Sequence, residues 1–287
     1  MQPLLSVLMT AFNRQSFIAE AIESVLASNY SNYELIILND ASTDKTYTIA
    51  ASFAAVDSRI KLHSNATNLG QFATRNKIVT FAQGEYLMYL DSDDKTYPHS
   101  FEYCVAEMII DKNVDVGMIC YNTDLHKKIF FPKEAIKYHF FNQQILVIGP
   151  GGHIFKTSFF KSTGGFVDKY EVASDMYFNL LYASKGTIKC LTKNFLYYRL
   201  HDGQAMNNKI GYIVNNYLYL RDALLNLDLG LTTIEVNYLF KKNKRRFILN
   251  TFYFFLKNKK FSIINTMYKK ANFTVKDFYE GVFHYFK

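Results

Sequence analysis

Short apolar runs alternate with amphipathic stretches through residues 5–91. The run Ser6–Thr10 predicts a buried strand. The segment over 17–28 predicts a helix, because its apolar residues repeat at the i, i+3, i+4, i+7 spacing of one helix face. These residues are Ile18, Ala21, Ile22, Val25 and Leu26. Further strands and helices follow in alternation, with strands over Tyr33–Asp40, 59–65 and 85–91, and helices over 41–53 and 68–84. The helix over 41–53 is expected to begin with Ser42 or Thr43 as its N-cap.

This alternation predicts an α/β fold, with a mostly parallel open sheet flanked by helices. After Pro98 the pattern is looser, and it predicts helices over Ser100–Ile110 and Ser174–Ser184 and short strands over 115–122 and 187–203. Residues 209–287 are typical of several helices, in which Lys and Arg are interleaved with aromatic residues. We therefore expect a sheet domain followed by a helical appendage.

Charge is divided unevenly along the chain, and the division marks the predicted domain boundary. The 287 residues carry a formal net charge of +8. Residues 1–203 hold 19 Lys and Arg against 20 Asp and Glu, whereas residues 204–287 hold 14 against 5. Because the whole basic excess lies after residue 203, we expect a sheet domain over 1–203 and a helical basic C-terminal region over 204–287.

The basic C-terminal region resembles interfacial helices in composition, since its Lys and Arg stand among Phe, Tyr, Ile and Leu. Two partners fit this composition: an anionic membrane surface, or a second copy of the chain in a homo-oligomer. The chain has no nucleic-acid-binding motif, so no nucleic acid partner is expected.

Cysteine usage and hydropathy indicate the compartment. Cys104, Cys120 and Cys190 are odd in number and lack metal-ligand spacing, which favours a reducing compartment. No apolar run approaches the roughly 18 residues of a membrane span, and the first residues do not have the pattern of a signal peptide. We therefore expect a cytoplasmic protein, held peripherally on the inner face of the cell membrane.

The densest group of negative charge follows an apolar run directly. Asp91, Ser92, Asp93 and Asp94 place three carboxylates side by side. One interpretation is a solvated turn, in which Asp93 or Asp94 caps the next helix. The other is a site for a divalent cation, Mg²⁺ or Mn²⁺, because a hard cation relieves the repulsion between neighbouring carboxylates and prefers oxygen ligands.

Three polar segments follow predicted strands and are expected to meet at one edge of the sheet. Asp40 ends one strand, Asp91 ends another, and the loop over 10–14 follows the first strand. In open α/β sheets the carboxyl ends of the strands line the ligand-binding crevice. The convergence favours the cation site, since a solvated turn does not predict it.

Three blocks of sequence, in order, resemble the family 2 glycosyltransferases with the A-type nucleotide-sugar fold. They are SVLMTAFNRQSFIAEAIESVLASNYSNYELIILNDASTD, NLGQFATRNKIVTFAQGEYLMYLDSDD and GGFVDKYEVASDMYFNLLYASKGTIKCLTKNFLYYRLH, within residues 4–203. The resemblance implies transfer of a hexosyl or N-acetylhexosaminyl group from a nucleoside diphosphate sugar, UDP-linked, with inversion at the anomeric carbon. The implied acceptor is a hydroxyl of a glycan or lipid-linked glycan in polysaccharide biosynthesis.

The resemblance also implies a role for each residue of the donor site. Asp40 accepts a hydrogen bond from N3–H of uracil, and Phe12 lies on the face of that base. Thr10, Arg14 and Arg75 lie beside the nucleotide. Ordinary alternatives are a helix cap for Asp40 and a core position for Phe12.

A second set of implied roles concerns the metal. Asp91 and Asp93 are the first and last residues of a DxD motif, with Ser92 between them. Asp93 or Asp94 binds the cation, Asp91 contacts the ribose or donor sugar, and His201 supplies a further metal ligand. A surface histidine is the ordinary alternative for His201.

Asp175 corresponds to the general base of the family. A carboxylate that removes the proton of an attacking sugar hydroxyl accelerates transfer by roughly 10²–10⁴-fold. The ordinary alternative is a dipole partner at the start of its helix. The chain departs from the family pattern at Asn39, Ala41 and Ser174, and the last of these leaves the tuning of Asp175 open.

Two other functions compete with sugar transfer. A nucleotidyltransferase that makes sugar nucleotides shares the α/β plan, but its Gly-rich phosphate loop is missing from the glycine-free segment TAFNRQSF. A non-catalytic scaffold that binds membrane is disfavoured by the intact set of carboxylates. Gly149–His153, with the sequence GPGGH, fits either an acceptor loop or a plain loop.

Overall fold

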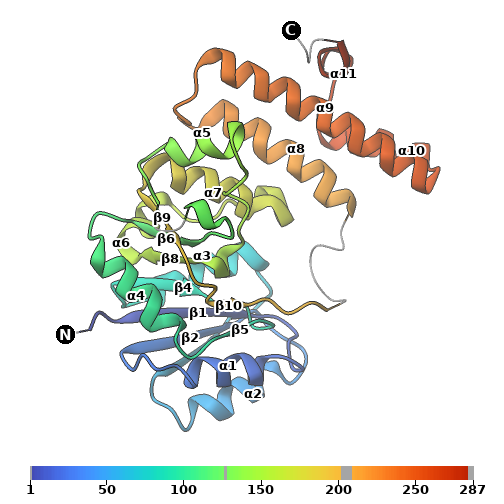
Figure 1. The fold of residues 1–287 in the computed structure, drawn as a ribbon. Helices are drawn as coiled ribbons and strands as arrows, with labels where there is room; N and C mark the ends of the chain where they lie inside the picture. The colour runs from blue at the N-terminus through green and yellow to red at the C-terminus, as the bar shows by residue number, and fades with distance from the viewer. Residues whose placement is uncertain (1, 126–127, 202–208, 284–287) are drawn as a thin grey trace.

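The computed structural model describes residues 2–125, 128–201 and 209–283. These residues form an eight-stranded sheet in the order β3-β2-β1-β4-β8-β6-β9-β7 (Figure 1). Its strands are β1 (Leu5–Ala11), β2 (Tyr33–Asn39), β3 (Ile60–Ser64), β4 (Tyr86–Tyr89), β6 (Val116–Ile119), β7 (Ile129–Phe130), β8 (His153–Lys156) and β9 (Ile188–Leu191). β5 (Lys95–Thr96) and β10 (Leu196–Tyr197) pair antiparallel in a separate small sheet.

The first half of the large sheet is parallel and the second half is mixed. β1 pairs in parallel with both β2 and β4, and β2 pairs in parallel with β3. β8 is antiparallel to β4 and β6, β9 is parallel to β6, and β7 is antiparallel to β9. The predicted open α/β sheet is therefore confirmed, with a parallel half that carries the three strand ends singled out in the sequence.

Seven helices of the described chain cover the two faces of this sheet. They are α1 (Ile18–Leu26), α2 (Thr46–Ala54), α3 (Gln71–Ile78), α4 (Ser100–Ile110), α5 (Glu134–Phe141), α6 (Thr157–Thr163) and α7 (Ser174–Lys185). Side chains alternate across the sheet, so that Val7 packs in the core with α1, α2 and α4, and Leu8 packs in the core with α3, α5, α6 and α7. Figure 1 shows α1 and α2 below the sheet and α5 and α7 above it.

Short 3₁₀ turns connect several of these elements, at η1 (Val79–Phe81), η2 (Thr123–Leu125), η3 (Pro150–Gly152) and η4 (Asp168–Ala173). The helix expected to run to Gly84 ends as an α-helix at Ile78 and continues only as η1. No helix of the described residues combines the length and apolarity that a membrane span requires.

The start of α2 differs from the prediction. The helix begins at Thr46, whose backbone N–H donates a hydrogen bond to Asp44 Oδ1 at 2.9 Å. Neither Ser42 nor Thr43 is the N-cap. Instead, Ser42 Oγ accepts from the backbone N–H of Asn13, and the Thr43 N–H donates to Asn13 Oδ1. Both residues therefore fasten the loop after β2 to the loop after β1.

The C-terminal region consists of α8 (Lys209–Asn226), α9 (Thr233–Asn258), α10 (Phe261–Lys270) and α11 (Val275–Phe283). A capping box between Thr232 and Glu235 begins α9. Tyr219, Leu220 and Leu239 extend the core of the sheet domain. A separate core lies between the helices, formed by Val214, Tyr217, Phe247, Met267, Ala271 and Phe273. The helical C-terminal region is confirmed, and the domain boundary at residue 203 stays a prediction.

Candidate active site

A cleft of about 920 Å³ lies at the carboxyl ends of β1, β2 and β4. Nine residues predicted from the sequence line it: Thr10, Phe12, Arg14, Asp40, Arg75, Asp91, Ser92, Asp93 and Asp175. They come from segments as far apart as residues 10 and 175. The parallel half of the sheet and the start of α7 bring them together.

Asp91, Asp93 and Asp94 form an acidic group at the edge of this cleft, and Asp91 and Asp93 line it. Ligand oxygens of Asp91, Asp93 and Asp94 all lie within 4.8 Å of one another. Asp94 is 3% exposed and accepts a hydrogen bond from the Arg199 N–H. Burial, with the charges of Asp91 and Asp93, raises the pKa of Asp94 to about 7. Asp93 and Asp94 are not helix caps, because the next helix, α4, begins only at Ser100.

Two cationic or polar side chains converge on Asp93. Arg14 Nε donates to Asp93 Oδ2 at 2.9 Å, and His201 Nε2 lies 3.1 Å from the same oxygen. His201 also packs against the Phe17 ring, with centroids 4.6 Å apart. His201 and Asp94 are not among the residues that line the cleft. His201 nevertheless contacts Asp93, and Asp94 belongs to the acidic group.

This donor set fits a hard divalent cation. Three carboxylates supply oxygen ligands, which suit Mg²⁺ or Mn²⁺ better than a soft metal. Burial raises the pKa of Asp94, and the neighbouring negative charges of Asp91 and Asp93 raise it further. A divalent cation removes the repulsion between these carboxylates. His201 lies beside the Asp93 carboxylate, so both side chains would bind the same cation.

Arg75 lies under this acidic group as a fully enclosed cation. Its side chain is 2% exposed, and Nη2 donates to Asp91 Oδ1 at 2.5 Å. With its amide turned by 180°, Gln71 accepts from Nη1 at 2.8 Å and from Nη2 at 3.0 Å. The Tyr89 hydroxyl donates to the Arg75 carbonyl oxygen. Arg75 is therefore held in one orientation, with its charge directed at Asp91.

Asp175 occupies the first turn of α7 and faces the same cleft. Burial raises the pKa of its carboxyl to about 6, and the nearby charge of Arg75 limits that rise. The Met176 N–H donates to Asp175 Oδ1 at 2.8 Å. A carboxyl group with a pKa near 6 is ionised at neutral pH and still basic enough to accept a proton, as general base catalysis requires.

Asp40 is fixed by the loop that precedes α3. Oδ1 accepts from Asn65 Nδ2 at 2.7 Å and from the Leu69 N–H at 2.9 Å, and Oδ2 accepts from the Gly70 N–H at 3.0 Å. Gly70 has a φ of 87°, which favours glycine. Asp40 therefore does not cap α2, and Oδ2 keeps an acceptor site for a ligand because a carboxylate offers about four.

Phe12 lies at the rim of the cleft rather than in the core. Its ring is 43% exposed, and the residue lines the cleft beside Thr10 and Asp40. The core alternative for Phe12 is wrong.

The opposite wall of the cleft was not predicted from the sequence. It includes residues of α5, the segment that follows it, α8 and α9, namely His139, Phe140, Asn142, Gln144, Tyr212, Asn216, Tyr219, Leu239, Lys242, Asn243 and Arg246. The only signal for α9 was the spacing of Lys242 and Arg246, four residues apart on one helix face. That spacing alone does not distinguish a cleft wall from a solvated surface.

The GPGGH segment is divided between the cleft and the core. Gly149 and Pro150 line the cleft. His153 is buried, with Nδ1 3.0 Å from the Gly149 carbonyl oxygen and Nε2 2.9 Å from the Tyr182 hydroxyl. Its imidazole therefore belongs to the core, and only the first residues of the segment are available to a ligand.

Residues 6–183 match the protein family described as Glycosyl transferase family 2. This match covers more than half of the chain. The chain belongs to glycosyl transferase family 2. The membership confirms the resemblance found in the sequence, and it argues against the nucleotidyltransferase alternative.

Two named relatives of this family 2 protein each match a little over a third of the chain. EpsE of Bacillus subtilis, named as a glycosyltransferase, is 43% identical over 105 residues, which are 36% of this chain and 38% of EpsE. WcaA of Escherichia coli, named as a colanic acid biosynthesis glycosyl transferase, is 39% identical over 104 residues, 36% of this chain and 37% of WcaA. The matched region thus spans little more than a third of these curated relatives.

A solved structure extends the comparison to nearly the whole fold. The crystal structure of S. aureus TarS 1–349 in complex with UDP-GlcNAc superposes with a TM-score of 0.73. The match covers 97% of this chain and 81% of that one, at 20% sequence identity. The family 2 chain therefore has the A-type glycosyltransferase fold, including the helices that follow the sheet domain.

Proposed function

We propose that this family 2 protein transfers a hexosyl or N-acetylhexosaminyl group from a UDP-sugar to a hydroxyl of a glycan or lipid-linked glycan, with inversion at the anomeric carbon. The observation that carries the proposal is the meeting of Asp40, Asp91, Asp93 and Asp175 in one cleft. The complex of TarS with UDP-GlcNAc supports a UDP-linked donor. The name of WcaA supports an acceptor in polysaccharide biosynthesis.

In this proposal the nucleotide lies over the ends of β1 and β2. Asp40 Oδ2 accepts a hydrogen bond from N3–H of uracil, and the exposed ring of Phe12 stacks on the base. Thr10 and Ser92 border the ribose, and their loops are joined because Ser92 Oγ donates to the Thr10 carbonyl oxygen.

The diphosphate end of the donor meets the acidic group. Asp93 and Asp94 would hold a Mn²⁺ or Mg²⁺ ion, with His201 beside them, and Asp91 would contact the ribose or donor sugar. Bound there, the cation supplies stabilisation of the negative charge that builds on the diphosphate. Arg14 and Arg75 hold Asp93 and Asp91 in place through ion pairs.

The chemical step is assigned to Asp175. Its carboxylate accepts the proton of the acceptor hydroxyl while that oxygen attacks the anomeric carbon on the face opposite to UDP. The new C–O bond forms as the bond to the diphosphate oxygen breaks, and UDP leaves with that electron pair. A single displacement of this kind inverts the anomeric configuration.

The proposal is tested with a panel of UDP-sugars and Mn²⁺, without an acceptor. We expect the protein to release UDP slowly from at least one of them, and we expect Asp93→Ala to stop this release. Asp57→Ala is the matched control, because Asp57 pairs with Arg59, two residues away, and does not line the cleft. If no UDP-sugar is hydrolysed and none binds in calorimetry, the proposed function is wrong.

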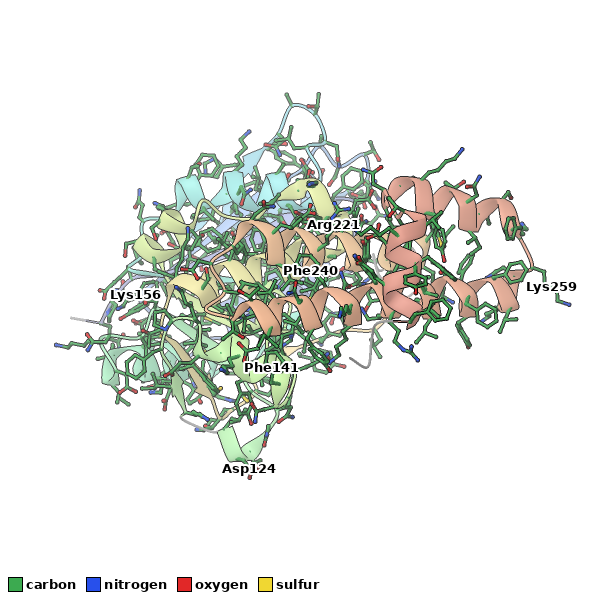
Figure 2. The ribbon with its side chains drawn as sticks, turned by 90° about the horizontal axis from the view of Figure 1, so that it is seen from above. Asp124, Phe141, Lys156, Arg221, Phe240 and Lys259 are labelled. Carbon is green, nitrogen blue, oxygen red and sulfur yellow. The ribbon has the colours of Figure 1, made fainter. Side chains whose placement is uncertain are left out.

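We further propose that the far end of the α9–α10 hairpin holds the enzyme on an anionic membrane, at the inner face of the cell membrane. Several large apolar side chains there are more than half exposed, namely Leu249, Phe252, Tyr253, Leu256 and Phe261. Lys257, Lys259 and Lys260 lie among them, and Figure 2 shows Lys259 at the outer tip of the hairpin. Apolar contact combined with nearby Lys is how interfacial helices bind anionic lipid. A homo-oligomer contact is the competing interpretation.

A further inference from the structure

Two cations of α9 line the cleft wall opposite the loops that follow β1, β2 and β4, where the sugar donor is proposed to bind. Lys242 and Arg246 are four residues apart, so both project from one helix face. Their neighbours on the helix point elsewhere. Lys241 and Lys244 line a separate shallow hollow, and Lys244 pairs with Asp277 and Glu280. The cleft therefore receives two specific cations of a generally basic region.

Neither cleft cation has an acidic partner among the residues that the structure describes. Arg246 Nη2 donates to the Asn216 carbonyl oxygen at 3.0 Å and to Asn243 Oδ1 at 3.1 Å. Both acceptors are uncharged, so they orient the guanidinium and leave its charge uncompensated. Like charges four residues apart destabilise a helix slightly. An anionic ligand would offset that repulsion.

His139 adds a neutral donor to the same place. Its Nδ1 accepts from the backbone N–H groups of Ile145 and Leu146, at 3.1 and 3.0 Å. The hydrogen of the neutral ring must therefore be on Nε2. Burial, together with the charges of Arg246 and Lys242, lowers the pKa of His139 to about 4. His139 of α5 therefore lies near both cations of α9, and all three residues line the cleft.

Tyr219 connects this cluster to the candidate base. Burial raises the pKa of the Tyr219 hydroxyl, the nearby charge of Arg246 limits that rise, and the charge of Asp175 adds to it. Tyr219, Arg246 and Asp175 all line the same cleft. An acceptor bound in this cleft can therefore present a hydroxyl to Asp175 and a negatively charged group to Arg246.

We propose that Lys242, Arg246 and His139 form an acceptor subsite for an oxyanion, either a phosphate or a carboxylate, carried by the acceptor close to its reacting hydroxyl. The inference rests on the proposed function, because it takes Asp175 as the base. It narrows the acceptor from any glycan hydroxyl to one beside a negative charge. The chemistry fits both anions, since Arg binds either one in a fork geometry and Lys adds a point charge.

The test uses matched sugars that differ only in the group at C6: glucose, glucuronate and glucose 6-phosphate. Binding of each is measured by calorimetry to the full chain saturated with UDP and Mn²⁺. We expect at least one anionic sugar to bind about tenfold or more tightly than glucose. Whichever of glucuronate and glucose 6-phosphate binds more tightly shows whether the subsite prefers a carboxylate or a phosphate. The double variant K242Q/R246Q is expected to erase this preference.

The single variant Lys241→Gln is the control for position, because it removes one positive charge from the same helix outside the cleft. It is expected to keep the preference of the parent. His139→Gln retains a side-chain donor and is expected to reduce the preference less than the double variant does. Equal binding of all three sugars by the parent, or a preference that survives K242Q/R246Q, overturns the subsite.

Three further outcomes separate this inference from the function on which it rests. If UDP competes with the anionic sugar, then the two cations serve the donor diphosphate, and the acceptor subsite is wrong. If the parent hydrolyses UDP-sugars but shows no charge preference, then only the subsite fails. If the parent neither binds nor hydrolyses a UDP-sugar, then the proposed function fails, whatever the anion result.

Discussion

The guanidinium of Arg75 bonds to Asp91 Oδ1 at 2.5 Å, although Arg75 is buried and Asp91 is one-third exposed. The same guanidinium acts on Asp175 through space and opposes the rise in its pKa. One buried cation therefore serves both carboxylates, one expected to face the donor and the other expected to act as base. This arrangement couples the two halves of the candidate site electrostatically.

Replacement of Arg75 is expected to change the pH profile as well as the rate. Arg75→Met removes a positive charge that favours ionised Asp175, so the pKa of Asp175 should rise above about 6. The acid limb of kcat against pH should move to higher pH by roughly one unit. Arg75→Lys keeps the charge and should hold the limb near the position of the parent. An unmoved limb in Arg75→Met argues against the coupling.

Asp175 itself determines the direction of the pH dependence. Because burial raises its pKa to about 6, the basic form is present above that pH and is lost as the pH falls through it. Transfer to the acceptor should therefore decline below about pH 6. Asp175→Asn, which keeps the size and removes the basicity, should lower kcat by roughly 10²-fold or more.

Donor binding provides the control for that variant. Asp175→Asn should bind UDP and Mn²⁺ nearly as tightly as the parent does, since the substitution leaves the donor loops unchanged. An Asp175→Asn enzyme with the kcat of the parent would exclude Asp175 as the base.

Asp93 is expected to connect the metal to nucleotide binding. Asp93→Ala removes one carboxylate of the acidic group and the partner of Arg14 and His201. Calorimetry should show loss of the Mn²⁺-dependent part of UDP binding, with Asp57→Ala unaffected. Equal UDP–Mn²⁺ affinity in the parent and in Asp93→Ala contradicts the metal assignment.

Asp40 is expected to govern the choice of base. Asp40→Asn keeps an oxygen acceptor for the loop that Asp40 anchors but replaces one carboxylate oxygen with an amide donor. Uracil N3 is a donor and cytosine N3 is an acceptor, so the preference for UDP over CDP should fall. A competition assay with the two nucleotides measures this preference. A ratio equal to that of the parent would falsify the Asp40 role.

Membrane attachment is tested by co-sedimentation with vesicles that contain anionic lipid. Substitution of Lys257, Lys259 and Lys260 by Gln should weaken binding, because each Lys near the surface contributes about 1 kcal/mol. High salt should weaken it too, since the Debye length falls from about 10 Å at 0.1 M salt to about 3 Å at 1 M.

The matched control for attachment is a triple Gln variant at Lys45, Lys185 and Lys193, which are exposed on the sheet domain. This control should bind vesicles as the parent does. Binding that ignores salt and lipid charge, or a change from dimer to monomer in the hairpin variant without lipid, favours the oligomer contact instead.

The donor half of the cleft was predictable from the sequence because it depends on strands. Apolar runs identify buried strands, and the carboxyl ends of neighbouring parallel strands lie at one edge of a sheet. Asp40 and Asp91 could therefore be expected to meet although about fifty residues separate them. The N-cap of α2 could not be foreseen, because Ser42 and Thr43 instead fasten their loop to Asn13.

The other half of the cleft was not predictable from the sequence, because it depends on which face of α9 is turned toward the cleft. Lys241 and Lys242 are adjacent in a run of basic residues, and nothing in their chemistry separates them. About 100° of helical rotation places Lys242 in the cleft and Lys241 outside it. The sequence suggested that all of residues 204–287 lie outside the active site, whereas α8 and α9 supply part of its wall.

The length of α9 has a consequence for how far the reaction takes place from a bilayer. Arg246 borders the cleft, and Lys259 lies thirteen residues further along, at the tip of the hairpin (Figure 2). At about 1.5 Å per residue, an unbroken helix separates these positions by roughly 20 Å. With the tip resting on lipid, α9 would act as a fixed spacer. A short glycolipid head would then fall below the cleft, and a growing chain of several sugars would reach it.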